Sequence, residues 1–199
     1  MKLYYAPGAC SLSPHIVAEE AGLKIDLVKV DLKAHRLEDG SDFYKINPKG
    51  SVPVLILDSG EMLTEGPAIV QYLADQNPDS GLAPACGTLP RYHLQEWLTF
   101  VNGEIHKTFG PLFHGVAGDE RKKVIETLQK KFDFADKALT RGSFLLGTTF
   151  TAADAYLFVM LTWAKKMHIP TGAALMDFYE RVSVRPKVVE AMKQEGLIH

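Results

Sequence analysis

Strand-like segments occur only in the first part of this 199-residue chain, and this restriction constrains the fold more than any other feature of the sequence. They are short apolar runs bounded by turn residues, at positions 2–6, 25–30, 52–57 and 62–64. Helices are expected among them at 13–21 and 65–73, with a short one near Tyr44. From residue 91 onward only helical spacing remains. We therefore predict a small α/β sheet domain followed by an all-α domain.

A stretch rich in proline and glycine marks the boundary between these two parts. Residues 77–90, NPDSGLAPACGTLP, carry three prolines and two glycines, which interrupt regular structure. We predict a first domain at 1–77, a linker at 78–90 and a helical domain at 91–199.

The helical domain is expected to contain a long helix that ends near Val116 and a second helix over 119–139. A third helix follows, in which almost every position is apolar. Thr151 and Asp154 have the spacing of a capping box, which predicts that this buried helix begins there.

Composition and charge exclude several classes of function. The chain is 46% hydrophobic and 23% charged, as ordinary globular proteins are, and its net charge is −2. No basic block is present to meet a phosphate backbone, so we expect no nucleic acid partner. The longest apolar run, 155–161, is far shorter than the ~20 residues of a membrane helix, so no membrane partner is expected.

The N-terminus and the cysteines indicate where the protein works. MKLYYAPGAC meets proline and glycine too early to form a secretory signal. Cys10 and Cys86 have no metal-ligand spacing. We predict a reduced, cytoplasmic protein without a metal site.

Cys10 lies between the first strand and the first helix. Ser13 and Pro14 are expected to cap and open that helix, so backbone N–H groups and the helix dipole would face the sulfur. A helix N-terminus lowers a cysteine pKa from about 8.5 to between ~3.5 and 7.5. We predict a thiolate in a Cys-x-x-Ser sequence, able to hold a mixed disulfide but without a second sulfur to resolve it. A buried, inert cysteine is the alternative interpretation.

Two backbone features nearby are candidate binding elements for a peptide. Pro53 cannot donate to a β-ladder, so Val52 could pair its backbone with an extended ligand; a rigid turn is the alternative. At Glu65 and Gly66 a helix begins, where free N–H groups bind carboxylates. Glu65 could pair with an ammonium group or simply complement the helix dipole.

The long helix has two unlike faces. One is an apolar stripe that comprises Trp97, Leu98, Val101, Ile105 and Phe109. The other carries the small or polar residues Thr99, Gly103, His106 and Gly110. His106 is either a solvated surface histidine or a group that faces Cys10.

Six short blocks of residues, spread along nearly the whole chain, together form a recognisable pattern. They are Tyr4-x-x-x-Gly8-Ala-Cys10-Ser, Asn47-Pro-Lys-Gly-x-Val52-Pro53, Leu63-Thr-Glu65-Gly-x-Ala-Ile, Gln71-Tyr-Leu-Ala, Glu104-x-His106-Lys107 and Phe150-Thr-x-Ala-Asp154-Ala-Tyr. Together these blocks resemble the bacterial beta-class glutathione transferases. The resemblance implies a thioredoxin-like N-terminal domain, an all-α C-terminal domain and a homodimer, with glutathione as co-substrate and no metal.

The resemblance also implies roles for individual residues. The cysteine at position 10 forms a mixed disulfide with glutathione, and His106 hydrogen-bonds near the sulfur. Val52 precedes a cis proline and pairs with the peptide, Glu65 and residue 66 hold the γ-glutamyl end, and Glu104 reaches across the dimer. The implied glutathione contacts are Ala9, Cys10, His35, Val52, Pro53, Glu65, Gly66, Thr99, Gly103, Glu104, Ile105, His106 and Lys107.

Three of these positions depart from the family pattern. His35 replaces a common lysine, Gly66 a frequent serine and Thr99 a usual asparagine. Because a histidine carries its charge only below about pH 6.5, we predict weaker and pH-dependent glutathione binding. The predicted function is glutathione conjugation, glutathione-dependent thiol-disulfide exchange through Cys10, or both. The alternative is a carrier or interaction protein that binds glutathione or apolar ligands without turnover.

Overall fold

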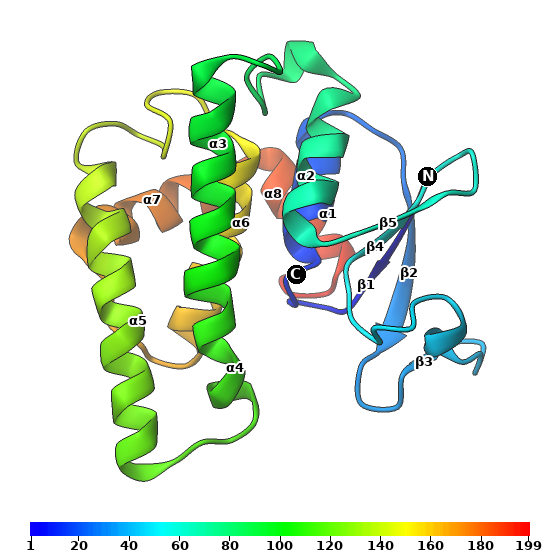
Figure 1. Cartoon of the computed structure of the whole chain (residues 1–199), viewed down its shortest axis with the longest axis horizontal. Helices are drawn as coiled ribbons and strands as arrows, with labels where there is room; N and C mark the ends of the chain where they lie inside the picture. Colours follow the sequence, from blue (N-terminus) through cyan, green and yellow to red (C-terminus); the bar gives the residue numbers. More distant parts are fainter. The chain divides into compact units, whose positions relative to one another are not determined.

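The computed structural model describes the whole chain, Met1–His199, and divides it into two compact units (Figure 1). The N-terminal unit comprises Met1–Leu82 and Arg185–His199, and the helical unit comprises Ala83–Val184. The division after Leu82 falls inside the predicted linker. The last segment groups with the N-terminal unit, although the sequence assigned it to the helical domain, because its helix α8 (Pro186–Gln194) packs against α1 (Leu12–Glu20).

A five-stranded mixed sheet forms the centre of the N-terminal unit, in the order β3-β2-β1-β4-β5. Its strands are β1 (Lys2–Tyr5), β2 (Asp26–Asp31), β3 (Arg36–Leu37), β4 (Val54–Ile56) and β5 (Met62–Thr64). β1 runs parallel to β2 and antiparallel to β4, and β4 and β5 form the predicted hairpin. β3 was not predicted, because two residues leave no periodic signal.

Helices complete the N-terminal unit. Besides α1 and α8 they are η1 (Phe43–Lys45), α2 (Gly66–Asp75) and η2 (Pro78–Ser80). α1 and α2 pack against each other, as Figure 1 shows. The predicted helices at 65–73 and near Tyr44 are therefore confirmed.

The start of α1 differs from the prediction. Ser13 lies within the first turn, and Ser11 occupies the N-cap position without making a side-chain cap bond. The reason is that both hydroxyls hold the preceding turn. The Ser13 hydroxyl donates to the Cys10 carbonyl at 2.8 Å, and the Ser11 hydroxyl accepts from the Ala6 N–H at 3.1 Å.

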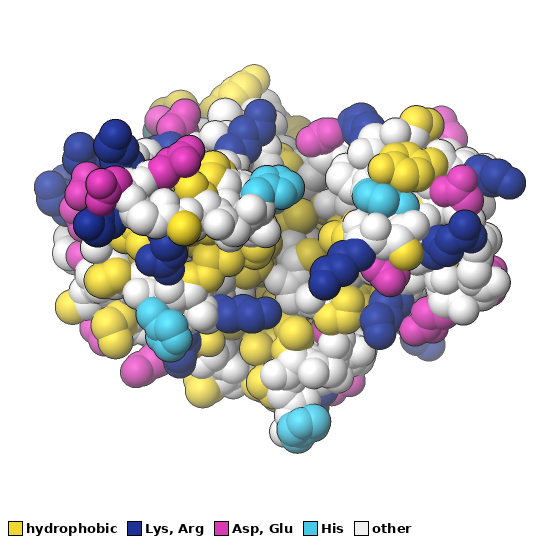
Figure 2. Space-filling view, turned by 90° about the horizontal axis from the view of Figure 1, so that it is seen from below, with side chains coloured by type: hydrophobic (Ala, Val, Ile, Leu, Met, Phe, Trp, Pro, Cys, Tyr) yellow, Lys and Arg dark blue, Asp and Glu magenta, His cyan; other side chains and the backbone are white.

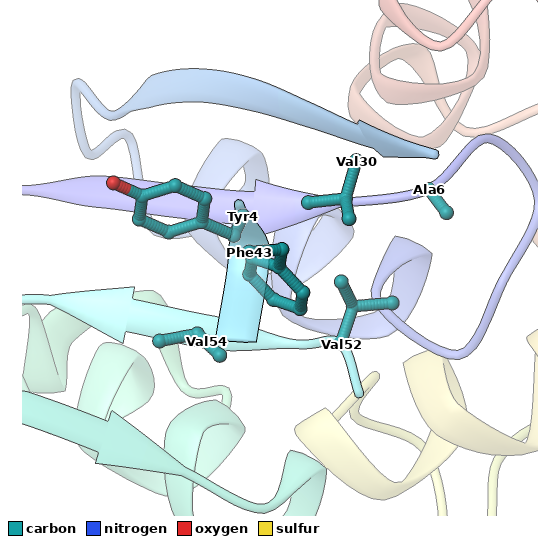
Figure 3. Close-up of a cluster of buried hydrophobic side chains, with 6 residues drawn as sticks. All are labelled: Tyr4, Ala6, Val30, Phe43, Val52 and Val54. Carbon is teal, nitrogen blue, oxygen red and sulfur yellow. The ribbon is translucent and has the colours of Figure 1, made fainter. Parts of the chain in front are cut away.

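A buried apolar cluster fixes the segment that leads into β4. Its members are Tyr4, Ala6, Val30, Phe43, Val52 and Val54 (Figure 3). The rings of Tyr4 and Phe43 lie 5.9 Å apart between centroids. Val52 is only 7% exposed, so its side chain anchors the backbone at the cis Val52–Pro53 bond.

The helical unit consists of α3 (Leu89–Phe100), η3 (Val101–His106), α4 (Lys107–Phe113), α5 (Gly118–Leu139), α6 (Ala152–Lys166) and α7 (Ala173–Ser183). The predicted long helix is present, but its middle, η3, is a π-helix, which the sequence did not predict. Nearly all of α6 is buried, as expected. No helix in the chain is long and apolar enough to cross a membrane.

The predicted capping box at the start of α6 is confirmed. The Thr151 N–H and hydroxyl donate to Asp154 Oδ2 at 2.8 and 2.7 Å, and the Leu145 N–H donates to Oδ1 at 2.8 Å. Asp154 is completely buried, and this burial raises the pKa of its carboxyl group to about 6. Asp154 therefore ties the loop before α6 to the first turn of that helix.

Charged side chains of both signs are interspersed on the face shown in Figure 2. The basic groups there do not form a continuous field, in keeping with the net charge of −2.

Candidate active site

The sulfur of Cys10 lies in the turn between β1 and α1, next to the segment that precedes β4. Its thiol donates to the Val52 carbonyl at 3.3 Å. The Ser13 hydroxyl is bound to the Cys10 carbonyl, so Ser13 stabilises the turn and does not take the place of a second redox sulfur. Cys10 and Val52, predicted as separate elements, are thus brought together.

The predicted thiolate at Cys10 is wrong for the protein without a ligand. Burial raises the pKa of the Cys10 thiol to about 12. The backbone N–H groups of Cys10 and Ser11 act in the expected direction and lower the pKa, but desolvation outweighs them. The negative charges of Glu65 and Glu195 raise the pKa further. Cys10 therefore carries a neutral S–H group.

A buried polar cluster that sequence reasoning missed supports the turn before Cys10. The Gly8 N–H donates to Glu195 Oε2 at 2.9 Å, and Glu195 Oε1 lies 3.0 Å from His15 Nδ1. His15 Nε2 lies 2.8 Å from Gln194 Oε1. His15 showed no ligand pattern in the sequence, and its partners are about 180 residues away. The cluster fastens the end of the chain to the Cys10 turn.

Val52 and Pro53 lie just outside the ladder, which begins at Val54. The peptide bond between them is cis, as the resemblance implied. The Val52 carbonyl faces Cys10, so the backbone next to the sulfur is the edge at which a peptide could pair.

Glu65 occupies the N-cap position of α2 with a φ of 71°, which non-glycine residues rarely adopt. Such a conformation costs of order 1–3 kcal/mol and is concentrated at functional sites. The exposed carboxylate binds the ammonium of Lys49 at 2.7 Å. Glu65 therefore pairs with an ammonium group of its own chain, and its contact with a ligand stays a prediction. Gly66 follows as the buried first residue of α2.

His35 lies in the loop before β3. Its φ is 50°, and its ring packs against Tyr44 with 4.5 Å between centroids and 33° between planes. His35 Nδ1 has no hydrogen-bond partner. Ala9 lies in the turn beside Cys10, where its N–H donates to the Ala6 carbonyl at 3.0 Å.

His106 ends the π-helix of the helical unit. Its Nδ1 lies 2.8 Å from the Tyr156 hydroxyl, and its ring packs edge-on against Trp163 at 5.0 Å. Burial, with a smaller contribution from the charge of Lys107, lowers the pKa of His106 below the ordinary 6.5. His106 is therefore a neutral base at pH 7, and not a solvated surface histidine.

The other predicted site residues of this helix differ in their exposure to solvent. Thr99, Gly103 and Lys107 are exposed. Ile105 is fully buried, so it presents no surface for the predicted contact with glutathione. Glu104 binds Lys131 of its own chain at 2.8 Å, which lowers the pKa of its carboxyl group.

Two further features lie outside the predicted site. A cavity of about 440 Å³ in the helical unit is lined by α3, α5 and residues 141–147, and it contains none of the predicted site residues. No group of three or more His, Cys, Asp or Glu side chains is gathered to hold a metal ion. Phe113 and Trp163 contact each other at 4.8 Å between centroids, and Trp163 also contacts His106.

The fold defines the class of protein. A mixed sheet with helices, together with an all-helical unit, is the predicted combination of a thioredoxin-like domain and an all-α domain. Residues 1–75 match the glutathione S-transferase N-terminal domain, and residues 118–184 match the glutathione S-transferase C-terminal domain. The predicted fold class is confirmed.

Individual relatives are similar over their whole length. Glutathione S-transferase GstA of Escherichia coli O157:H7 is 44% identical over 200 residues, which cover 99% of this chain and 100% of GstA. A sphingomonad glutathione S-transferase complexed with glutathione shares 47% identity with a TM-score of 0.93, and the beta-class enzyme of Sphingomonas chungbukensis shares 46% with a TM-score of 0.92. Both matches cover 100% of each chain. The chain belongs to the glutathione S-transferase family, and the predicted beta-class glutathione transferase is confirmed.

Proposed function

We propose that the protein conjugates glutathione to small electrophiles, with Cys10 as a hydrogen-bond donor to the glutathione sulfur. In this reaction the glutathione thiol loses its proton, the sulfur forms a bond to carbon, and the leaving group departs with its electron pair. The observation that carries the proposal is the neutral Cys10 thiol beside the Val52 carbonyl. The donor stands next to backbone that a peptide can pair with.

The raised pKa of Cys10 favours a donor over a nucleophile. A thiol with a pKa of about 12 stays protonated at pH 7, so it can stabilise a neighbouring thiolate but attacks disulfides slowly. We propose the neutral His106 as the general base, because a neutral imidazole can accept the proton of the glutathione thiol.

The remaining contacts are proposed from the geometry of each residue. Glu65 binds the γ-glutamyl ammonium in place of Lys49, and Val52 pairs with the cysteinyl backbone of the tripeptide. The related sphingomonad enzyme, whose structure contains glutathione, supports glutathione as the co-substrate. The carboxylate of Glu104 is engaged by Lys131, so a contact across a dimer would need that ion pair to open.

Thiol-disulfide exchange is a second candidate, because Cys10 is partly accessible to solvent. The Cys10 sulfur would attack oxidised glutathione, form a mixed disulfide and release one glutathione thiolate. Ionisation of Cys10 is the costly step. We expect this reaction to be slower than conjugation at pH 7.

The two roles of Cys10 are separated by Cys10→Ser and Cys10→Ala, each made in a Cys86→Ser background. Conjugation to a chlorodinitrobenzene and intact mass after incubation with oxidised glutathione are measured for each. If Cys10 is a hydrogen-bond donor, we expect Cys10→Ser to retain the conjugation rate and Cys10→Ala to lower it about tenfold or more. Equal loss in both, with an adduct on the parent, favours the nucleophile. A parent without adduct or turnover supports the carrier alternative.

We also propose a homodimer in a reducing, cytoplasmic compartment. Cys10 forms no disulfide, which is typical of such a compartment. Three large apolar side chains of α3 and α5 are exposed: Leu89 by 67%, Tyr92 by 59% and Phe134 by 57%. Phe134 packs against Trp97 and Phe100, with centroid distances of 5.7 and 5.1 Å. An aromatic patch of this kind is typical of protein interfaces.

The oligomeric state is tested by light scattering on the wild type and on Phe134→Lys. We expect a dimer for the wild type and a monomer for the variant, with Phe113→Lys, an equally exposed phenylalanine, as the control that remains dimeric. A monomeric wild type would contradict the proposal.

A further inference from the structure

We propose that Tyr156 and Asn102 are positioning residues that hold His106 in the tautomer whose Nε2 is free to accept a proton. The inference rests on the proposed function, in which His106 takes the proton of glutathione. All three residues belong to the helical unit.

The hydrogen bonds of the Tyr156 hydroxyl fix which ring nitrogen carries hydrogen. The hydroxyl donates its single hydrogen to Asn102 Oδ1 at 2.7 Å. It can therefore only accept from His106 Nδ1, which lies 2.8 Å away. Nδ1 thus carries hydrogen, and a neutral imidazole has no hydrogen left for Nε2.

The fold explains why these three groups meet. Asn102 and His106 are four residues apart on η3, so they share a face of that helix, and η3 packs against α6. Tyr156 projects from α6 between them and is only 1% exposed. π-helical segments are frequently found at functional sites, and here the segment brings both partners to one hydroxyl.

Two further neighbours act on the His106 ring, one by contact and one by charge. Trp163, also from α6, meets His106 at 5.0 Å between centroids and 72° between planes. Lys107, from α4, is the charged group that acts on His106, and its charge disfavours the imidazolium. Tyr156 is the titratable group that contacts the ring from α6. The ring is therefore held in orientation by contacts with two side chains of α6.

The arrangement has a direct chemical consequence. The glutathione thiol gives its proton to Nε2, which leaves a thiolate and an imidazolium. The Nδ1–H of the imidazolium keeps its hydrogen bond to the Tyr156 oxygen, and the Tyr156 hydroxyl keeps donating to Asn102 Oδ1, so no second proton has to move. In the opposite tautomer, Nε2 would already carry hydrogen and could not accept one.

The experiment reads the tautomer itself and is independent of turnover. Long-range ¹H–¹⁵N spectra are recorded on the full-length protein at pH 8, with His106 assigned from its loss in His106→Gln. We expect hydrogen on Nδ1 and a bare Nε2 in the wild type. In Tyr156→Phe we expect a mixture of tautomers and kcat/KM for conjugation lowered about tenfold. A wild type with hydrogen on Nε2, or an unchanged spectrum in Tyr156→Phe, overturns the inference.

Matched variants separate positioning from packing. Tyr179→Phe removes another partly buried hydroxyl of the helical unit and should change neither spectrum nor activity. Asn102→Asp keeps an acceptor for Tyr156 and should keep the tautomer, whereas Asn102→Leu should lose it. Loss of the tautomer in Asn102→Asp as well overturns the inference. If the tautomer follows these expectations but His106→Gln conjugates normally, the proposed role of His106 in the reaction fails and the positioning stands.

Discussion

The Cys10 turn and the His106 segment each surround a neutral group, but with different kinds of partner. At Cys10 the protein supplies backbone: the N–H groups that open α1, the Val52 carbonyl and a turn held by Ser13. At His106 it supplies side chains, Tyr156 and Asn102, from two packed helices.

Burial acts on both groups and has opposite effects on their pKa values. It raises the pKa of the Cys10 thiol and lowers the pKa of His106, because in each case it disfavours the charged form. The result at pH 7 is a neutral acid in one unit and a neutral base in the other. At Cys10 the N–H groups at the start of α1 are not sufficient to ionise the thiol, because the sulfur is also desolvated.

The largest expected effect is the pH dependence of Cys10 alkylation. If the rate did not depend on pH, Cys10 would not be the neutral acid that the comparison with His106 requires. The thiolate fraction grows tenfold per pH unit below the pKa, so the rate should rise about 100-fold between pH 7 and pH 9 without a plateau. The measurement is iodoacetamide labelling of Cys86→Ser by mass spectrometry. A rate that levels off below pH 7 would restore the thiolate that the sequence predicted.

Loss of the Asp154 cap should be the next largest effect, because it weakens the helix that carries Tyr156. Asp154→Ala leaves the Thr151 and Leu145 N–H groups without their acceptor, and we expect about 2 kcal/mol less free energy of unfolding at pH 7. Thr151→Ser, which keeps the hydroxyl, is the control. Urea denaturation followed by circular dichroism gives both values.

The same variant has a defined pH signature. The pKa of Asp154 is raised to about 6 in the folded protein, against an ordinary value of about 3.9. The folded state therefore binds the proton more tightly than the unfolded state, and this contribution to stability falls as the pH rises from about 4 to about 6. The difference between wild type and Asp154→Ala should be larger at pH 4 than at pH 7, and the reverse order would contradict it.

A smaller effect concerns substrate recognition in the N-terminal unit. Glu65→Gln removes the charge that holds an ammonium group, so KM for glutathione should rise about tenfold while kcat changes little. Glu61→Gln, at another exposed acid, serves as the control. Steady-state kinetics with glutathione as the varied substrate test this. A fall in kcat at constant KM would place Glu65 in the chemical step instead.

The smallest effect is expected at His35, whose Nδ1 lacks a partner. His35→Lys provides a permanent charge and should tighten glutathione binding at pH 8 by about twofold, as an exposed ion pair does. Calorimetric titration of both proteins at pH 8 checks this, and equal affinities would dismiss a role for position 35.

The sequence predicted most of the fold because its signals are local. The alternation of β2, the hairpin of β4 and β5, and the capping box of Thr151 and Asp154 each depend on neighbouring residues. The prediction is wrong where one local pattern fits two structures. Ser13 fits an N-cap by its sequence, but its hydroxyl donates to the Cys10 carbonyl and Ser11 occupies the N-cap position.

What the sequence determined by itself is the order of elements, since periodicity and spacing are properties of the chain, and the resemblance of its residue blocks gave the family. The tertiary structure alone decided how these groups ionise and which way they point. The pKa of Cys10 depends on how closely other atoms enclose its sulfur, and the tautomer of His106 depends on a hydroxyl 50 residues away. Desolvation and long-range hydrogen bonds exist only once the chain has folded.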